Sequence, residues 1–144
     1  MTTTTLDAFV SAIGAALVAR STVPEAAIYY QQEPIQSPYA EDTVYVNQGD
    51  TQQKRLLQDL FEVIGNFEIT CWVSDDAVNP KANLRTTLNA LVAKVLLALN
   101  YDESFGDLAR ASEVYSTITD GGYFAEAGKA VAKVYLRATF YTVN

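Results

Sequence analysis

Few residues of this chain could carry out catalysis, and Cys71 is the first of them. A cysteine acts as a nucleophile or a metal ligand only as the thiolate. Cys71 lies in a run that alternates apolar and polar residues, on the side shared with Phe67, Ile69 and Val73. We therefore expect a buried strand residue with a raised pKa. Because the chain has no histidine to act as a base and no second cysteine, Cys71 is predicted to serve as a small core hydrophobe.

Two pairs of neighbouring acids, Asp75–Asp76 and Asp102–Glu103, could bind Mg²⁺ or Ca²⁺ through oxygen. Neither pair has further carboxylates at the spacing of a calcium loop, so turn formation is the favoured interpretation. Gly121–Gly122 is predicted to form a hairpin turn, because no lysine followed by serine or threonine marks it as a phosphate loop. The sequence thus predicts no catalytic site, no metal and no cofactor, and we expect a protein that is not an enzyme.

Length and charge limit the class of protein further. The chain has 144 residues, with 17 acidic against 10 basic side chains and a net charge of −7. This length allows one domain to bury a core without metals or disulfides. The acidic balance disfavours a broad basic face for nucleic acid. No apolar stretch reaches the roughly 18 residues that span a bilayer, and the N-terminus lacks the positive flank of a secretory signal, so we expect a soluble protein made in the cytoplasm.

Apolar residues at spacings of three and four predict two helices. The first runs from residue 6 to about residue 20, with Thr4 as its cap and Asp7 near its positive end. The second is expected to begin with Asn79 as N-cap and Pro80 in the first turn, and to carry leucines as far as Leu99.

Alternating residues predict strands at 26–32, 42–47, 61–74, 112–119 and 128–143. A turn is expected at 47–50, and the polar stretch 31–59 is interpreted as a long loop or partner-binding arm. The resulting order is α-β-β-β-α-β-β. It predicts an α+β fold in a single domain of residues 1–144, with a mainly antiparallel sheet and both helices packed on one face.

The opposite face of this sheet is the candidate interface. It is too mixed in charge to be core, and the chain's nine tyrosines fit a surface that another chain covers. The basic row on the last strand could form ion pairs with a neighbouring strand or could meet an acidic surface of another subunit. The candidate interface residues are Lys129, Lys133, Arg137, Tyr135, Tyr141, Trp72, Glu62, Glu68, Tyr39 and Tyr45.

The C-terminal half of the chain suggests a family. A long strand ends in Asp75–Asp76, a leucine-rich helix follows Asn79–Pro80, and a strand runs into Gly121–Gly122. The closing strand, residues 128–142, has small residues followed by alternating aromatics. In this order and pattern, over about half of its length, the chain resembles tail terminator proteins, also called tail completion or head-tail joining proteins, of long-tailed bacteriophages.

The resemblance implies a non-catalytic virion protein. Such a subunit closes into a homohexameric ring on the tail tube, stops tube growth and offers a docking surface to the neck or head-completion protein, and to a sheath protein if the tail is contractile. DNA passes through the lumen without specific binding, which an acidic protein suits. The alternatives are another neck or head-completion protein, a tail tube subunit, a small module that binds a ligand or peptide, and an enzyme that uses carboxylates alone.

Overall fold

The chain folds into one twisted sheet with two helices beneath it. The computed structural model describes residues 3–21, 23, 27–30, 42–75, 83–119 and 128–143. In chain order the elements are α1 (Leu6–Ser21), β1 (Ile28–Tyr30), β2 (Thr43–Arg55), β3 (Leu60–Ser74), α2 (Leu84–Asn100), β4 (Ala111–Thr119) and β5 (Lys129–Val143). The strand order in the five-stranded sheet is β1-β2-β3-β5-β4. Among the described strands, only the β1–β2 pair is parallel, so the predicted α+β class and element order are confirmed.

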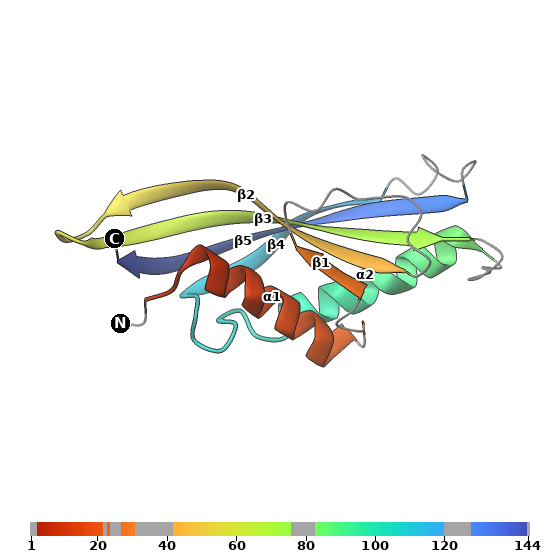
Figure 1. Cartoon of the computed structure of the whole chain (residues 1–144), viewed down its shortest axis with the longest axis horizontal. Helices are drawn as coiled ribbons and strands as arrows, with labels where there is room; N and C mark the ends of the chain where they lie inside the picture. The colour runs from red at the N-terminus through yellow and green to blue at the C-terminus, as the bar shows by residue number, and fades with distance from the viewer. Residues whose placement is uncertain are drawn as a thin grey trace.

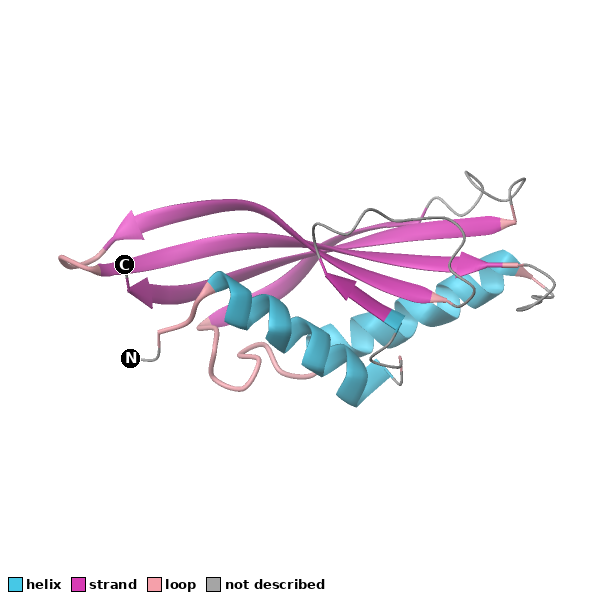
Figure 2. Ribbon diagram, viewed as in Figure 1, coloured by secondary structure: helices cyan, strands magenta, loops and turns pink. Residues whose placement is uncertain are grey.

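Both helices cover the same face of the sheet, as Figures 1 and 2 show. We call this the inner face and its opposite the outer face. The long alternation in β5 is the clearest reason for this arrangement, because all six residues predicted to share one side are at most 1% exposed. These residues are Ala130, Ala132, Val134, Leu136, Ala138 and Phe140. Small side chains along β5 let the helices approach the sheet closely.

Phe9 is the point at which the helices, the sheet and the loop after α2 meet. Its side chain is completely buried. Its ring centroid lies 5.1 Å from that of Phe67 in β3, 5.1 Å from that of Phe105 in the loop, and 5.6 Å from that of Phe140 in β5. Tilted and offset aromatic contacts of this kind add to the free energy gained from burying apolar area.

The prediction of a long loop or arm within residues 31–59 is wrong for residues 51–55, which continue β2, whereas the strand predicted at 42–47 is found as the start of β2. The expected turn at 47–50 is instead a register shift between Gln48 and Thr51, after which β2 continues to Arg55 beside β3. Residues 47–55 of β2 lie at the edge of the sheet, because β1 pairs only with Val44–Val46 among the described residues. The side chains of residues 47–55 are polar on both faces. Polar edge strands discourage uncontrolled pairing with other chains. The remainder of the predicted arm, residues 31–41, lies outside the described residues.

The helix starts differ from the predicted ones. Thr5 caps α1, because its Oγ1 accepts a hydrogen bond from the Ala8 amide at 3.1 Å. Thr4 is buried instead and ties the chain to the end of the sheet, donating its amide to the Tyr141 carbonyl at 2.6 Å. α2 begins at Leu84 and its N-cap is Asn83, which accepts a hydrogen bond from the Thr86 amide at 3.1 Å.

The predicted cap and first turn of the second helix, Asn79–Pro80, lie outside the described residues, as does Gly121–Gly122.

Within β4, the alternation fails at a bulge. The register shifts between Val114 and Ser116, so Val114 faces Leu136 on the inner side but Ile118 pairs with Lys133 on the outer side. A bulge reverses the side on which later residues point, which explains why Ile118 is 51% exposed.

Replacement of Phe9 by alanine should destabilise the fold strongly. The change removes a buried ring from three aromatic contacts and leaves a cavity, so we expect the free energy of unfolding to fall by about 3–5 kcal/mol. Urea unfolding followed by circular dichroism measures this. Val18→Ala on the exposed side of the same helix is the control and should change stability by about 0.5 kcal/mol or less. Equal losses in the two variants would contradict the proposed role of Phe9.

Candidate interaction surface

The outer face brings together most of the residues predicted to form an interface. The antiparallel register places Glu62 opposite Tyr141, Glu68 opposite Tyr135 and Thr70 opposite Lys133. Trp72 and Arg137 lie on the same two strands with the same orientation. The backbone of Lys129 pairs with Ser74, and its side chain is not described. Tyr39 lies outside the described residues.

Two basic residues of the outer face whose side chains are described, Lys133 and Arg137, are paired within the chain, as is Arg110 beside them. The ion pairs are Lys133 Nζ to Glu68 Oε1 at 3.3 Å, Arg110 Nη1 to Glu62 Oε2 at 3.3 Å, and Arg137 Nη1 to Glu113 Oε1 at 3.6 Å. The predicted β3–β5 pairing therefore forms at Lys133, whereas Arg137 pairs with an acid of β4. All three pairs are open to solvent, so each adds about 0–1 kcal/mol to stability. These pairs neutralise Lys133 and Arg137. The aromatic side chains beside them are therefore the uncharged exposed part of this face.

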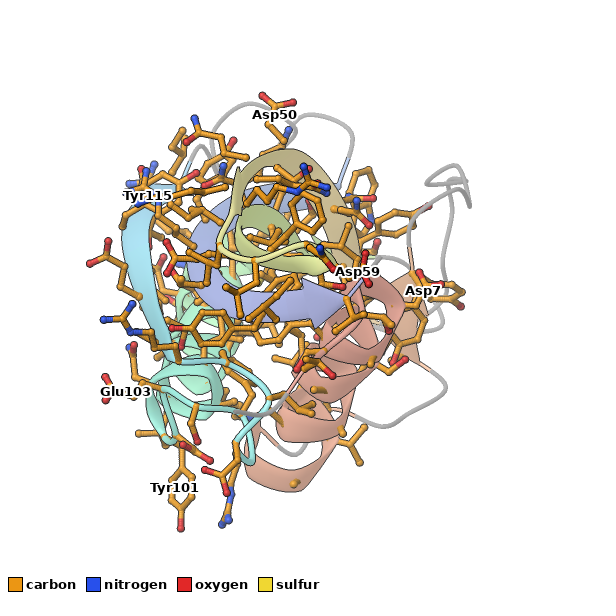
Figure 3. The ribbon with its side chains drawn as sticks, turned by 90° about the vertical axis from the view of Figure 1, so that its left-hand side faces the viewer. Asp7, Asp50, Asp59, Tyr101, Glu103 and Tyr115 are labelled. Carbon is orange, nitrogen blue, oxygen red and sulfur yellow. The ribbon has the colours of Figure 1, made fainter. Side chains whose placement is uncertain are left out.

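The exposed aromatic part of the outer face lies across β4 and β5. The rings of Tyr115 and Tyr135 are 6.1 Å apart, and the Arg137 guanidinium lies 4.5 Å from the Tyr115 ring centroid. Tyr115 and Ile118 are about half exposed. We call Tyr115, Ile118, Tyr135 and Arg137 the β4–β5 patch. Sequence reasoning did not select Tyr115 and Ile118, because β4 is an edge strand whose bulge cannot be located from alternation alone. Figure 3 shows Tyr115 at the upper left and Tyr101 at the bottom of the same view.

At the other end of the outer face, near the start of β2 and the end of β3, several side chains are buried. Tyr45 is 5% exposed, and its ring stacks on that of Tyr29 at 6.4 Å between centroids. Thr43, Thr70 and Ser74 are also buried here. Tyr45 is thus part of the packed interior of this chain, not an exposed contact residue.

A second exposed apolar feature is the tip of the β2–β3 hairpin, residues 56–59. Leu57 is 69% exposed and Leu56 is 37% exposed. The amide of Leu56 donates to the Leu60 carbonyl at 2.8 Å. The guanidinium of Arg55 also closes the turn, donating to the Gln58 carbonyl from Nε at 3.2 Å and from Nη2 at 2.9 Å. The tip therefore presents its leucines in a fixed conformation, beyond the start of α1 in Figure 1.

A third feature is a groove of about 290 Å³ on the helical side of the molecule. α1 has two charged residues among its sixteen, Asp7 and Arg20, and alanines occupy much of its solvent side. A helix without a polar face is typical of a buried helix. The groove lies against these alanines and is closed by the end of α2 and the following loop. Its lining residues include Ala12, Ala15, Ala16, Ala19, Tyr101 and Phe105.

The loop that walls this groove is held in an unusual conformation. Phe105, Gly106 and Asp107 have φ angles of 49°, 72° and 67°, a left-handed conformation that is strained for residues other than glycine. The Asp102 carboxylate accepts hydrogen bonds from the Ser104 hydroxyl at 2.7 Å, the Ser104 amide at 2.9 Å and the Gly106 amide at 2.9 Å. The pKa of Asp102 is lowered, mainly by the hydrogen bond from the Ser104 hydroxyl and further by the hydrogen bonds from the two backbone amides. Its charge therefore stabilises the loop, and this acid pair forms a turn as predicted.

The described residues offer little chemistry. Burial raises the pKa of the Cys71 thiol to about 12, as predicted for a core cysteine. No group of three acids, cysteines or histidines is placed to hold a metal ion in the part of the chain that the structure describes. None of the described helices has the length and apolar content needed to cross a bilayer.

Comparison with protein-family models and with curated proteins finds no match to this chain. The surfaces described above therefore have to be interpreted from their own geometry.

Cys71 should be inert while the protein is folded. A thiol with a pKa of about 12 is almost entirely protonated at about pH 8, and alkylation requires the thiolate. We expect no iodoacetamide adduct on the native chain and complete modification in urea, measured by intact mass. Because the folded pKa is above the unfolded value of 9.0, this group's contribution to stability is full below pH 9 and is lost as the pH rises toward 12. Rapid alkylation of the native chain would contradict burial of Cys71.

Proposed function

We propose that this chain is a structural subunit of a bacteriophage tail, a tail terminator that forms a ring on the tail tube, stops its growth and offers a docking surface to the neck. The resemblance in the C-terminal half motivates the proposal. The observation that carries it is the presence of exposed apolar features on different sides of one small subunit: the β4–β5 patch, the hairpin tip and the helical groove. Exposed apolar surface in a soluble domain marks contacts with other chains.

Contacts at different sites on one subunit favour a ring. When two copies meet through two different surfaces, the growing assembly keeps one free surface of each kind at its ends, so growth continues until the assembly closes or becomes a filament. The partners in this proposal are further copies of the chain, the tail tube protein, a neck or head-completion protein, and a sheath protein if the tail is contractile. The site of action is the virion, and the net charge of −7 suits a conduit that DNA crosses without binding.

Two alternatives make different predictions. A tail tube subunit, or another neck protein, would use the same kinds of surfaces, but a tube subunit polymerises alone into long tubes. A small-ligand module would need an enclosed pocket with a few directed polar groups. The groove of about 290 Å³ is at the small end for such ligands, and alanines line much of it, so assembly is the favoured interpretation.

Tube growth in the presence of the protein tests the proposal. The tail tube protein of the same virus is allowed to polymerise with and without this chain, and tube lengths are measured by negative-stain microscopy. We expect shorter tubes with a cap at one end, and native mass spectrometry should detect either a ring or a monomer that assembles only on tubes. Uncapped tubes of unchanged length, or long tubes formed by this chain alone, would contradict the proposal.

Charge reversal on the outer face should weaken assembly without unfolding the chain. In Lys133→Glu combined with Arg137→Glu, the lost ion pairs are solvent-exposed and together account for roughly 2 kcal/mol at most. The stacked Arg137 that orders the β4–β5 patch is lost as well. We expect native circular dichroism and reduced tube capping. The matched control is Arg85→Glu combined with Lys94→Glu on the exposed side of α2. Equal capping by the two double variants would show that Lys133 and Arg137 take no part in assembly.

A further inference from the structure

We propose that the hairpin tip of one copy inserts into the helical groove of the next copy. This inference rests on the proposed function, because it names the contact that joins neighbouring subunits of the ring. The hairpin tip is residues 56–59 between β2 and β3, and the groove lies between α1 and the loop after α2.

The two surfaces fit in size and polarity. The tip has two exposed leucines, and the β2 strand that leads into it is polar from Asn47 to Arg55. The groove is apolar, is lined by alanines and has a volume of about 290 Å³, which suits one or two aliphatic side chains better than a folded segment. Both surfaces are preorganised, because Arg55 closes the tip and Asp102 fixes the groove wall. Preorganised partners lose less conformational entropy when they bind.

Charges beside the two surfaces are complementary. Arg20 and Asp102 line the groove, and the Arg20 guanidinium lies 3.7 Å from the Tyr101 ring centroid. The hairpin tip has Arg55 on one strand and includes Asp59. An inserted tip can therefore place a base near Asp102 and an acid near Arg20. Complementary charges at the edge of an apolar contact favour one orientation of the partners over others.

Within one copy, the hairpin tip cannot contact the groove. Figure 1 shows the hairpin projecting at one end of the sheet, beyond the start of α1, whereas the groove is lined by the second half of α1, the end of α2 and the following loop. β3 is paired with β5 along its whole length, so the hairpin is held away from its own groove. A second copy of the chain is therefore the occupant that the structure favours, and the contact is of the head-to-tail kind that generates rings.

Cysteine cross-linking tests this contact directly. Copies with Leu57→Cys are mixed with copies that have Ala15→Cys, both in the full chain, and are oxidised on tail tubes and in concentrated solution. The native Cys71 is buried and should not interfere. Disulfides form only when the two Cα atoms come within about 7 Å, so we expect a linked dimer whose peptides join positions 57 and 15. Leu57→Cys mixed with Ala90→Cys, an exposed alanine on α2, is the matched control and should give no disulfide-linked dimer.

Substitution provides a second readout. Leu57→Asp should weaken association by roughly 10- to 100-fold, because a buried leucine contact is lost, and Ala15→Arg should have a similar effect by filling the groove. Val143→Asp, also exposed, and Ala90→Arg are the controls.

If the unmodified chain caps tubes but no 57–15 cross-link forms, or the Ala90→Cys mixture cross-links equally, the hairpin contact is wrong and the proposed function stands. If the unmodified chain does not shorten tubes, the proposed function fails, and absence of the cross-link in concentrated solution then overturns the hairpin contact too.

Discussion

The structure depends on the packing of Phe9 against three other phenylalanines. α1 has almost no polar face, so its position cannot be determined by amphipathicity alone. The contacts of Phe9 with Phe67, Phe140 and Phe105 fix α1 on β3, on β5 and on the loop after α2 at once. This packing defines the helical side of the molecule, including the groove, and leaves the outer face of the sheet and the hairpin available for other chains.

The division between core and contact surface follows from this constraint. Along β5 the inner positions are small or apolar and fully buried, whereas most outer positions from Lys133 to Tyr141 are charged or aromatic. The charged residues Lys133 and Arg137 are neutralised by acids of the same sheet. Exposed apolar side chains are present at the β4–β5 patch and at the hairpin tip, and the proposed assembly role rests on them.

Sequence patterns predicted the elements that bury one face and missed those that do not. β3 and β5 alternate over fifteen residues each, so their buried sides could be read directly. β2 beyond Val46 is polar on both sides, and its hydrogen-bond partners come from β3, so no local pattern reveals it as a strand. The bulge that exposes Ile118 and the groove between α1 and Phe105 arise only from tertiary packing. The outer-face residues of β3 and β5 were predictable, whereas Tyr115 and Leu57 were not.

The proposed function requires that copies of this chain close into one ring at the end of a tail tube. Cryo-electron microscopy of tubes grown with the protein tests it most directly, because the averaged tube end gives both the number of copies and their arrangement. We expect a single closed ring of this chain at one end of each tube. Tube ends without density for this chain, or density that repeats along the whole tube, would contradict it.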